Sequence, residues 1–427
     1  MILMMGFNLI FFLSILILLL VFVNEVSANG GVFHVKHKFA GQARSLKDFK
    51  VHDSNRHGRF LAGVDFPLGG DGQPTGTGLY FTKIGIGYPS KDYFVHVDTG
   101  SDILWVNCIQ CDQCPKSSGL GVDLKLYDPD RSLNGRIVYC DDKFCTALNK
   151  GPISGCLSGM LCSYSLQYGD GSGTAGYFVN DVIGFDQVSG NLQTTSGNAS
   201  VTFGCGVKQT GNLIQSSEAL DGILGFGNSS SSMISQLASS GVVKKKFAHC
   251  LDSNGGGIFA IGNVVQPKVN TTPLVLDQAH YNVNMEAVKV GNTVLQLPKE
   301  VFETGNGKGT IVDSGTTLSY FPAAIYEPLL SMITSSQNLS LHTVEDVFSC
   351  FEFGKSVDEA FPTVTFQFEN SLELMVYPHE YLFPLNEKQW CIGWQNSGSL
   401  SKDVKDTILL GGLDYRNKIN KSYSDVL

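Results

Sequence analysis

Two short segments of this 427-residue chain share one pattern, and each copy contains an acid. Phe94–Ser101 reads Phe-Val-His-Val-Asp-Thr-Gly-Ser, and Thr310–Thr316 reads Thr-Ile-Val-Asp-Ser-Gly-Thr. In both, an apolar, strand-like run leads to an aspartate (Asp98 or Asp313) that a hydroxyl residue, a glycine and a second hydroxyl residue follow. Two buried carboxyl groups that meet share one proton and divide the roles of acid and base. The pair therefore predicts hydrolysis by a water that two carboxyl groups activate.

A second repeat strengthens the first, because a single Asp-Thr-Gly is also an ordinary turn sequence. Downstream of Asp98 the chain reads Asp-Gly-Ile-Leu-Gly at 221–225, and downstream of Asp313 it reads Thr-Ile-Leu-Leu-Gly at 407–411. Each ends in two apolar residues and a glycine. A strand of this kind allows close approach of another backbone, so we expect one to run beside each aspartate loop.

The elements that position these loops are mostly strands. Hydrophobic residues make up 43% of the chain and charged residues 16%, and glycine occurs 48 times between short runs of β-branched and aromatic residues. This texture predicts an all-β fold with few helices, the best candidates being Met233–Ser239 and Ala323–Thr334. Turn and breaker residues near 254–269 mark a junction. We therefore expect an N-terminal lobe at 78–262 and a C-terminal lobe at 271–427.

The N-terminus has the features of an export signal. Residues 9–23 are almost wholly apolar, and Val-Ser-Ala at 26–28 offers the small residues that a signal peptidase prefers, which predicts a signal peptide at 1–28. No Lys or Arg precedes the apolar run, so a retained signal anchor is the alternative. Nothing later in the sequence is long and apolar enough to span a bilayer, so we expect no stable membrane span after signal removal.

A basic segment follows the signal. Residues 29–64 carry seven Lys or Arg against two Asp or Glu, whereas the whole chain has a net charge of −9. Such a segment lies across an acidic body and detaches when carboxylates protonate, so we predict a propeptide at 29–64. A flexible basic arm is the alternative. The acidic body argues against nucleic-acid binding.

Eleven cysteines in an exported chain indicate disulfides. The run at 108–115, Cys-x-x-Cys-x-x-Cys-Pro, also matches part of an iron–sulfur ligand pattern, but an oxidising destination disfavours a cluster. Because eleven is odd, one thiol stays free or pairs in another way. The disulfide candidates are Cys108, Cys111, Cys114, Cys140, Cys145, Cys156, Cys162, Cys205, Cys350 and Cys391.

Asparagine-linked glycosylation has several possible acceptors in this sequence, since the motif Asn-x-Ser/Thr recurs. A glycoprotein is the prediction, although the motif only permits the modification. The candidates are Asn198, Asn228, Asn270, Asn338 and Asn420.

From about residue 45 to about 411 the chain resembles the pepsin-like aspartic peptidases, on the paired Asp motifs and the two apolar-apolar-Gly strands. Within that family it is most similar to the cysteine-rich plant branch of nepenthesin-like and aspartic-proteinase-like proteins. The resemblance implies a bilobal β fold in which Asp98 and Asp313 are the catalytic pair and flank one water at the floor of a cleft. It implies no cofactor and no metal, and activity at acidic pH. We expect Cys350 and Cys391 to bridge within the second lobe, and the other connectivities stay open because sequence does not determine them.

The same resemblance implies roles for the neighbours of the pair. The outer hydroxyls would bond the carboxylates, the inner hydroxyls would bond the backbone of the opposite loop, and the glycines would leave room for both. These supporting residues are Thr99, Gly100, Ser101, Ser314, Gly315 and Thr316.

The segment 164–174, which contains Tyr-Gly-Asp-Gly, resembles the family's flap, a glycine-rich hairpin that closes over substrate. The resemblance makes Tyr168 the flap tyrosine, followed by Gly169, with Trp105 as its hydrogen-bond partner. His96 lies two residues before Asp98 on the same face of the predicted strand. A packed or solvated histidine is the interpretation we favour, and an influence on the pair is the alternative.

The end of the chain departs from the family. Members usually carry Asp after the second apolar-apolar-Gly, whereas Gly412 stands here, and the tail at 413–427 is mostly polar. We expect this tail not to fill the strand positions of a buried sheet, which leaves the C-terminal lobe without its last strands. A shortened product with impaired activity is therefore one hypothesis.

Three functions compete on this reading. The leading one is a monomeric secreted or vacuolar endopeptidase that acts on peptide or protein substrates. The second is a protein-binding inhibitor, because plant xylanase inhibitors share the fold but lack an intact pair. The third is a folded, inactive family member.

Overall fold

The computed structural model describes most of the chain from residue 63 to residue 423. The gaps lie at 71, 76–77, 189–193, 254, 263–269, 306, 336, 338, 346, 401–403 and 417–418. The predicted signal peptide and residues 29–62 of the predicted propeptide lie outside the described residues. Gly63 and Val64, the last two residues of the predicted propeptide, begin the first strand, and the Val64 side chain is fully buried. The propeptide cut site stays a prediction.

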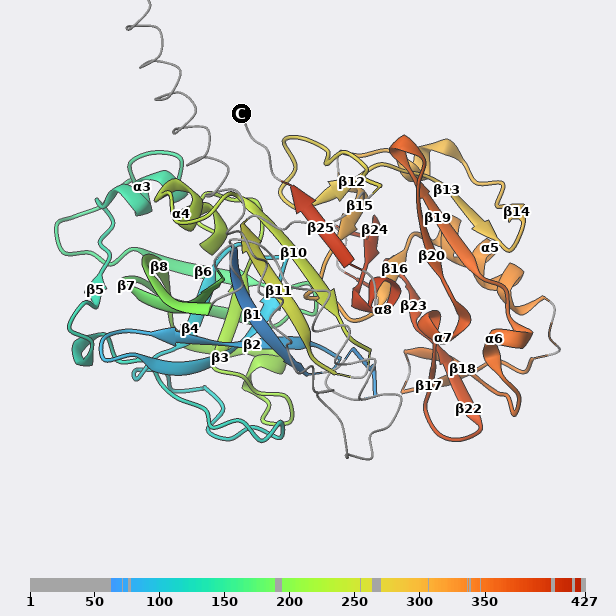
Figure 1. Cartoon of the computed structure of the whole chain (residues 1–427), viewed down its shortest axis with the longest axis horizontal. Coiled ribbons are helices and arrows are strands. Elements are labelled where there is room, and N and C mark those ends of the chain that lie inside the picture. The colour runs from blue at the N-terminus through green and yellow to red at the C-terminus, as the bar shows by residue number, and fades with distance from the viewer. Residues whose placement is uncertain are drawn as a thin grey trace, which may run out of the picture. The chain divides into compact units, whose positions relative to one another are not determined.

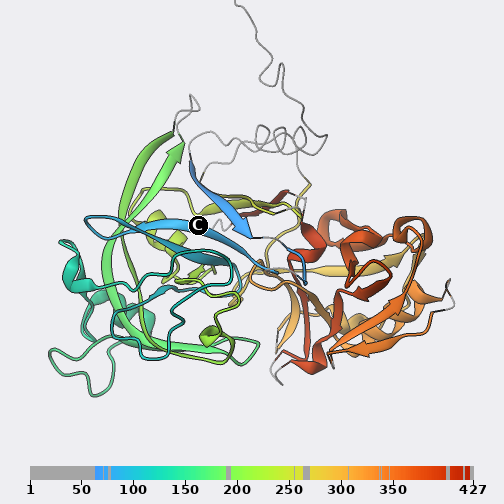
Figure 2. The same cartoon turned by 90° about the horizontal axis from the view of Figure 1, so that it is seen from below.

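The first lobe is built on one twelve-stranded sheet with the order β25-β10-β11-β1-β2-β3-β9-β4-β8-β7-β5, in which β6 pairs with β7. The long hairpin of β7 and β8 is seen in green in Figure 2. The strands are β1 (Gly63–Gly70), β2 (Tyr80–Ile86), β3 (Lys91–Asp98), β4 (Leu104–Asn107), β5 (Arg136–Ile137), β6 (Ser163–Gln167), β7 (Gly173–Val188), β8 (Thr194–Thr210), β9 (Gly222–Gly225), β10 (Lys246–Leu251), β11 (Gly257–Gly262) and β25 (Ile419–Tyr423).

The second lobe, gold to red in Figure 1 apart from the red β25 of the first lobe's sheet, has three smaller sheets, ordered β12-β15-β24-β16-β23, β14-β13-β19-β20 and β17-β18-β22-β21. Its strands are β12 (Asn282–Val283), β13 (Met285–Val290), β14 (Thr293–Val294), β15 (Lys308–Val312), β16 (Ser319–Phe321), β17 (His342–Val344), β18 (Phe348–Glu352), β19 (Val364–Phe368), β20 (Leu372–Val376), β21 (Leu382–Pro384), β22 (Gln389–Ile392), β23 (Trp394–Asn396) and β24 (Asp406–Leu410).

Helices are short and few among the described residues, which confirms the predicted all-β class. Both predicted helices form with the expected bounds. The Ser232 side chain caps the first by accepting from the Ser235 amide, and Pro322 precedes the second. The α-helices are α3 (Lys143–Leu148), α4 (Met233–Ser239), α5 (Ala323–Thr334), α6 (Val357–Ala360), α7 (Pro378–Tyr381) and α8 (Gly412–Tyr415). No helix in the described part of the chain is long and apolar enough to cross a bilayer.

Each lobe has a large apolar core of its own. In β2 buried positions alternate with more exposed ones, as in a strand with one face toward a core. Phe226, Phe247 and Phe259 pack together in the first lobe. In the second, Trp394 stacks on Tyr381 with ring centroids 4.5 Å apart. Two independent cores agree with the predicted pair of lobes.

The tail behaves differently from the prediction that the last strands are missing. β25 pairs antiparallel with β10, from Lys246 opposite Tyr423 to Cys250 opposite Ile419, at the edge of the first lobe's sheet (Figure 1). Backbone N–H and C=O groups make this ladder whatever the side chains are. An edge strand also tolerates polar residues, so the pattern rule for buried sheets did not apply here.

All ten candidate cysteines form disulfides, and Cys250 is the remaining thiol. Four bonds lie in the first lobe, and the second lobe contains the predicted bond between Cys350 and Cys391. The pairs are Cys108–Cys205, Cys111–Cys114, Cys140–Cys156, Cys145–Cys162 and Cys350–Cys391. The alternative of an iron–sulfur cluster is wrong, because the sulfurs of the 108–114 run are bonded to other sulfurs.

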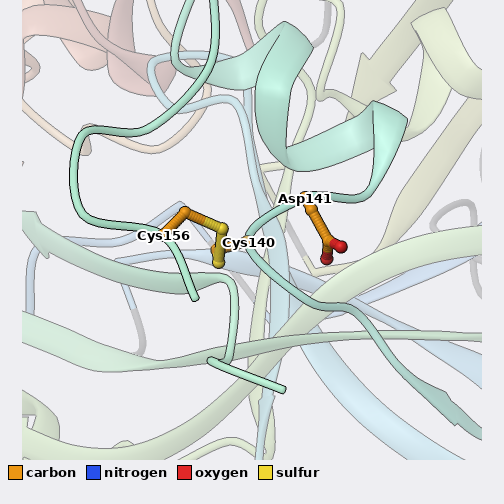
Figure 3. Close-up of side chains that lie close together, drawn as sticks. All are labelled: Cys140, Asp141 and Cys156. Atoms are coloured by element: carbon orange, nitrogen blue, oxygen red, sulfur yellow. A yellow bond between two sulfur atoms is a disulfide. The ribbon is translucent and has the colours of Figure 1, made fainter. Parts of the chain in front are cut away.

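One group of side chains has the proximity of metal ligands. Cys140, Asp141 and Cys156 lie close together in the first lobe (Figure 3). The two sulfurs are joined, as the yellow bond in Figure 3 shows, so they offer no thiolate to a metal. This group is a disulfide beside a surface carboxylate.

The glycosylation candidates differ in their surroundings. Asn198 and Asn270 are exposed, whereas Asn228 is half-buried and its side-chain oxygen accepts a hydrogen bond from Lys245 Nζ at 3.0 Å. Asn338 lies outside the described residues. Exposure favours glycosylation at the first two, which stays a prediction.

Candidate active site

The two aspartates stand at the ends of two strands with matching surroundings. β3 pairs in parallel with β9, so that Asp98 lies opposite Gly225, and β15 pairs in parallel with β24. The Asp313 amide donates to Leu410 O at 3.0 Å. Both predicted apolar-apolar-Gly strands thus run beside an aspartate loop. A Cβ on Gly225 would lie 2.5 Å from backbone atoms of Asp102 and Ile103, so the close approach requires a glycine.

The two loops are hydrogen-bonded to each other across the lobes. The Ser314 amide donates to Thr99 Oγ1 at 2.9 Å, and the Thr99 amide donates to Ser314 Oγ at 3.2 Å. The Ser314 hydroxyl also donates to Val97 O at 3.1 Å, and the Thr99 hydroxyl to Val312 O at 3.5 Å. Both side chains are buried. This reciprocal set fixes the position of one aspartate loop relative to the other.

The glycines of the two motifs lie against the opposite carboxyl groups. A Cβ on Gly100 would come within 2.6 Å of Asp313 Oδ2, and one on Gly315 would overlap Asp98 Oδ1. No real side chain tolerates such contacts without movement. The structure therefore brings Asp98 and Asp313 into one small space. Residues 215 positions apart in sequence form a single site.

Each carboxyl group is held by donors from its own loop. The Gly100 amide donates to Asp98 Oδ1 at 2.8 Å, and the Ser101 hydroxyl donates to Asp98 Oδ2. In the second loop the Gly315 amide donates to Asp313 Oδ1 at 2.8 Å, and the Thr316 hydroxyl to Oδ2 at 2.7 Å. The matching contacts give the site an approximate two-fold arrangement of carboxyl groups and donors.

Burial dominates the titration of the pair. It raises the pKa of Asp98, against hydrogen bonds from Ser101 and Gly100 that stabilise the anion. Burial and then the charge of Asp98 raise the pKa of Asp313 to about 6. A hydrogen bond between the two carboxyl groups lowers the pKa of Asp98 and raises that of Asp313. Two such groups titrate as one unit that holds a shared proton over an acidic range of pH.

His96 is packed inside the protein, in line with the interpretation we favoured. The residue is 7% exposed, and its Nε2 atom is buried without a hydrogen-bond partner among the described residues. Burial lowers the pKa of His96 to about 4, although the charge of Asp313 acts in the opposite direction. The imidazole is therefore neutral above that pH.

The flap candidate forms the predicted hairpin. β6 and β7 pair from Ser163 opposite Tyr177 to Gln167 opposite Gly173, and the Tyr168 amide closes the tip by donating to Ser172 O at 2.8 Å. The Trp105 indole donates to the Tyr168 hydroxyl at 2.7 Å. Burial, and then the charge of Asp98, raises the pKa of Tyr168. The tyrosine thus lies within electrostatic reach of the pair.

We predict that Trp105→Phe lowers kcat/KM by about tenfold, because Tyr168 loses the hydrogen bond that fixes its hydroxyl, a loss of about 1.4 kcal/mol. Steady-state kinetics on a fluorogenic peptide measures the effect. Phe keeps most of the buried ring, so the melting temperature should fall only slightly. Unchanged kinetics would show that this bond does not orient the flap.

Stability should also depend on pH. Burial raises the pKa values of Asp65, Asp221 and Asp313 to about 6. Their contribution to the free energy of unfolding is therefore full below about pH 4 and is lost as pH rises through 6. Burial lowers the pKa of His96 and His249 to about 4, so their contribution is full above pH 6.5 and is lost as pH falls to 4. Three carboxyl groups thus favour stability at low pH and two histidines favour stability at neutral pH, so the effect of the carboxyl groups is the larger.

We therefore expect the melting temperature to be higher at pH 4 than at pH 7, by roughly 5 °C. Differential scanning calorimetry at constant ionic strength tests this. Asp65→Asn should reduce the difference, since it removes one of the groups that ionise on the way to pH 7. A melting temperature that rises steadily from pH 4 to pH 7 would contradict the expectation.

Some features of the site have no signal in the sequence. The charge of Asp170, at the flap tip, adds to burial in raising the pKa of Tyr320 on β16. The flap tip is therefore in electrostatic reach of the second lobe. Asp170 and Tyr320 are about 150 residues apart and belong to no motif, so the sequence gives no indication that they lie near each other.

Gly412, the expected departure from the family, leaves the second loop intact. The Gly412 amide donates to Thr316 O at 2.8 Å, and the Leu413 amide to Thr317 O at 3.0 Å. A Cβ at position 412 would lie 3.7 Å from Leu251 Cδ1, an ordinary contact distance. The backbone alone makes the bonds to the Asp313 loop, so glycine at 412 does not remove them.

Comparison with known proteins identifies two family domains that together cover most of the chain. Residues 80–263 match the xylanase inhibitor N-terminal domain, and residues 280–419 match the xylanase inhibitor C-terminal domain. Aspartic proteinase 36 of Arabidopsis thaliana is 49% identical over 400 residues, which cover 93% of this chain and 83% of that protein. Aspartic proteinase nepenthesin-2 of Nepenthes gracilis is 28% identical over 82% of this chain and 76% of its own.

Solved structures share the fold at low identity. Conglutin gamma, a basic 7S globulin from lupine seeds, superposes with a TM-score of 0.65 at 17% identity, covering 85% of this chain and 92% of its own. Basic 7S globulin from soybean gives a TM-score of 0.63 at 18% identity, covering 85% and 94%. At this identity the likeness concerns the fold alone.

Proposed function

Because the chain belongs to the plant branch of the pepsin-like aspartic protease family, we propose that it is an endopeptidase that hydrolyses peptide bonds at acidic pH. Its substrates are exposed or unfolded segments of peptides and proteins. Asp98 and Asp313 are the catalytic residues, and Tyr168 on the flap covers the substrate.

In the proposed reaction a water binds between the two carboxyl groups. Asp98, ionised, takes a proton from this water as the oxygen attacks the peptide carbonyl carbon. Asp313, protonated, donates to the carbonyl oxygen. Collapse of the tetrahedral intermediate breaks the C–N bond, and a proton passes to the leaving nitrogen. Burial raises the pKa of both carboxyl groups, which supports a pair that keeps one proton at acidic pH, and the assignment of the base to Asp98 and the acid to Asp313 is part of the proposal.

One observation carries the proposal: the reciprocal bonds between Thr99 and Ser314 hold an aspartate from each lobe in one buried space. A purely structural pair of turns would not require two carboxyl groups to share that space. Burial raises the pKa of both carboxyl groups, because their ionised forms cost free energy in the folded protein, and the fold tolerates that cost at this point. Perturbed carboxyl groups that face one another are typical of acid–base catalysis.

Export and processing are part of the proposal. Five disulfides suit an oxidising compartment, so we place the protein in the secretory pathway, outside the cell or in the vacuole, after removal of residues 1–28. The basic segment that follows would act as a propeptide. Mass spectrometry of the secreted form tests both cut sites.

The test of the activity is incubation of the purified protein with a denatured substrate protein at pH 3–6, with and without a pepstatin-type inhibitor. New peptide termini that the inhibitor suppresses support the proposal. Absence of inhibitor-sensitive cleavage across this range would overturn it.

A binding role is the second candidate, because the matching domains carry the name of xylanase inhibitors. A protein of that kind would bind a xylanase and would not need the two carboxyl groups. Loss of function on changing Asp98 separates the candidates, since a binding protein would be insensitive to it.

A further inference from the structure

Asp414 is a buried acid that the proposed reaction does not use. It lies on α8, directly after the second apolar-apolar-Gly strand, and it is fully buried. Its two carboxylate oxygens have different donors. The Ser319 hydroxyl donates to Oδ2 at 2.7 Å, and the Trp394 indole donates to Oδ1 at 2.8 Å. A buried carboxylate is costly, so its retention here requires these partners.

The partner Ser319 joins Asp414 to the strand beside the catalytic loop. While its hydroxyl donates to Asp414, the same oxygen accepts from the Gly411 amide at 2.9 Å. The preceding residue on β24, Leu410, accepts from the Asp313 amide at 3.0 Å. The other partner, Trp394, is packed in the second lobe's core against Phe321 and Tyr381. Asp414 therefore connects that core to the strand that supports Asp313.

A second connection leads to the same loop. The Gly412 amide donates to Thr316 O at 2.8 Å, and the Thr316 hydroxyl donates to Asp313 Oδ2 at 2.7 Å. Both connections start on the short helix that contains Asp414. Catalytic groups that are displaced by about 1 Å can lose about 10²-fold in rate, so the supports of such a loop matter to the rate.

We propose that Asp414 is a positioning residue of the peptidase reaction: through Ser319 and Gly411 its carboxylate holds the Asp313 loop in the geometry that the water attack requires. The inference rests on the proposed function. It concerns a group that does not touch substrate. No spacing in the sequence indicates it, because Ser319 and Asp414 are 95 positions apart.

Asp414→Asn is the informative change, since it keeps the shape and removes one acceptor. The Trp394 N–H only donates, so the amide oxygen must face it and the NH₂ group must face Ser319. Ser319 Oγ would then have to accept from two donors, and its own proton would lose its acceptor. We expect kcat per active site to fall by about tenfold to a hundredfold, with KM changed by less than about threefold.

Active sites are counted by titration with a tight pepstatin-type inhibitor, so that misfolded protein does not enter kcat. Asp406→Asn, the same substitution at an exposed position at the start of β24, is the matched control and should leave kcat unchanged. Ser319→Ala breaks the connection from the other side. The double variant should be no slower than the slower single variant, because both act on one connection.

An unchanged kcat per active site in both single variants overturns the inference, and so do effects of Asp414→Asn and Ser319→Ala that simply add. If Asp414→Asn does not fold, the Ser319→Ala kinetics decide alone. If the wild-type chain binds the inhibitor without cleaving substrate, the proposed function fails. The inhibitor affinities of Asp414→Asn and Ser319→Ala, compared with that of the wild type, then test whether Asp414 positions the site. A wild-type chain that neither cleaves nor binds overturns both.

Discussion

Asp98→Asn is expected to lower kcat by at least about 10³-fold at the optimal pH. An amide cannot take the proton of the attacking water, so the variant lacks the base, and general acid–base catalysis of this kind contributes up to about 10⁴-fold. Asp313→Asn should be equally inactive, because it lacks the acid. The two carboxyl groups act as one unit, so the loss of either one removes the whole contribution of the pair to the rate. The double variant should therefore be no slower than either single variant.

The stability of the Asp98→Asn variant separates chemistry from folding. Burial in the folded protein raises the pKa of Asp98, so the ionised form of this side chain costs free energy there. Removing that charge should leave the melting temperature at pH 7 within a few degrees of the wild type, since the lost acceptor offsets part of the gain. Asp92→Asn, on the exposed part of the same strand, is the matched control and should keep full activity. Cleavage by Asp98→Asn at the wild-type rate would exclude the two-carboxyl mechanism.

Gly315→Ala is expected to lower kcat by about 10²-fold or more, through a single added methyl group. The new Cβ would overlap Asp98 Oδ1, so the carboxyl group or the loop must move. The hydrogen bonds of Ser314 to Thr99 restrict that movement, because they hold the loop from its other side. Displacement of the carboxyl group is therefore the expected relief, and it separates the catalytic pair.

Gly354→Ala is the control for this variant. Position 354 is exposed and has no heavy atom within 4 Å of an added Cβ, so the methyl group has free space far from the catalytic loops. It should leave kcat within about threefold of the wild type. Active-site titration again separates kcat from the folded fraction. Equal kcat for Gly315→Ala and the wild type would show that the two loops do not approach as closely as the structure places them.

The glycines show how much of the site was predictable. Asp-Thr-Gly-Ser and Asp-Ser-Gly-Thr, each after an apolar run, indicated two equivalent loops, and each loop forms at the end of a strand with its hydroxyl on its own carboxylate. These contacts span three residues, so local sequence determines them. That the glycines leave room for the approach of the two loops was expected only from the family resemblance, since contacts between residues more than 200 positions apart have no local cause.

The tail shows the opposite case. A mostly polar segment gave no strand pattern, yet β25 pairs with β10 in the other lobe, because an edge ladder depends on backbone groups. In the sequence, Asp414 is likewise only one residue of that polar tail, and no motif marks it. Its role depends on Ser319 and Trp394, which lie 95 and 20 positions away.

By itself the sequence determined the strand-rich lobes, the disulfide-forming cysteines and the two acids, because period, turn chemistry and residue type act over a few neighbours. Only the tertiary structure decided which sulfurs pair in the first lobe, where the last strand lies and which side chains support Asp313. Those outcomes depend on contacts between distant segments, whose free energies are set when the lobes pack and not by any short stretch of chain.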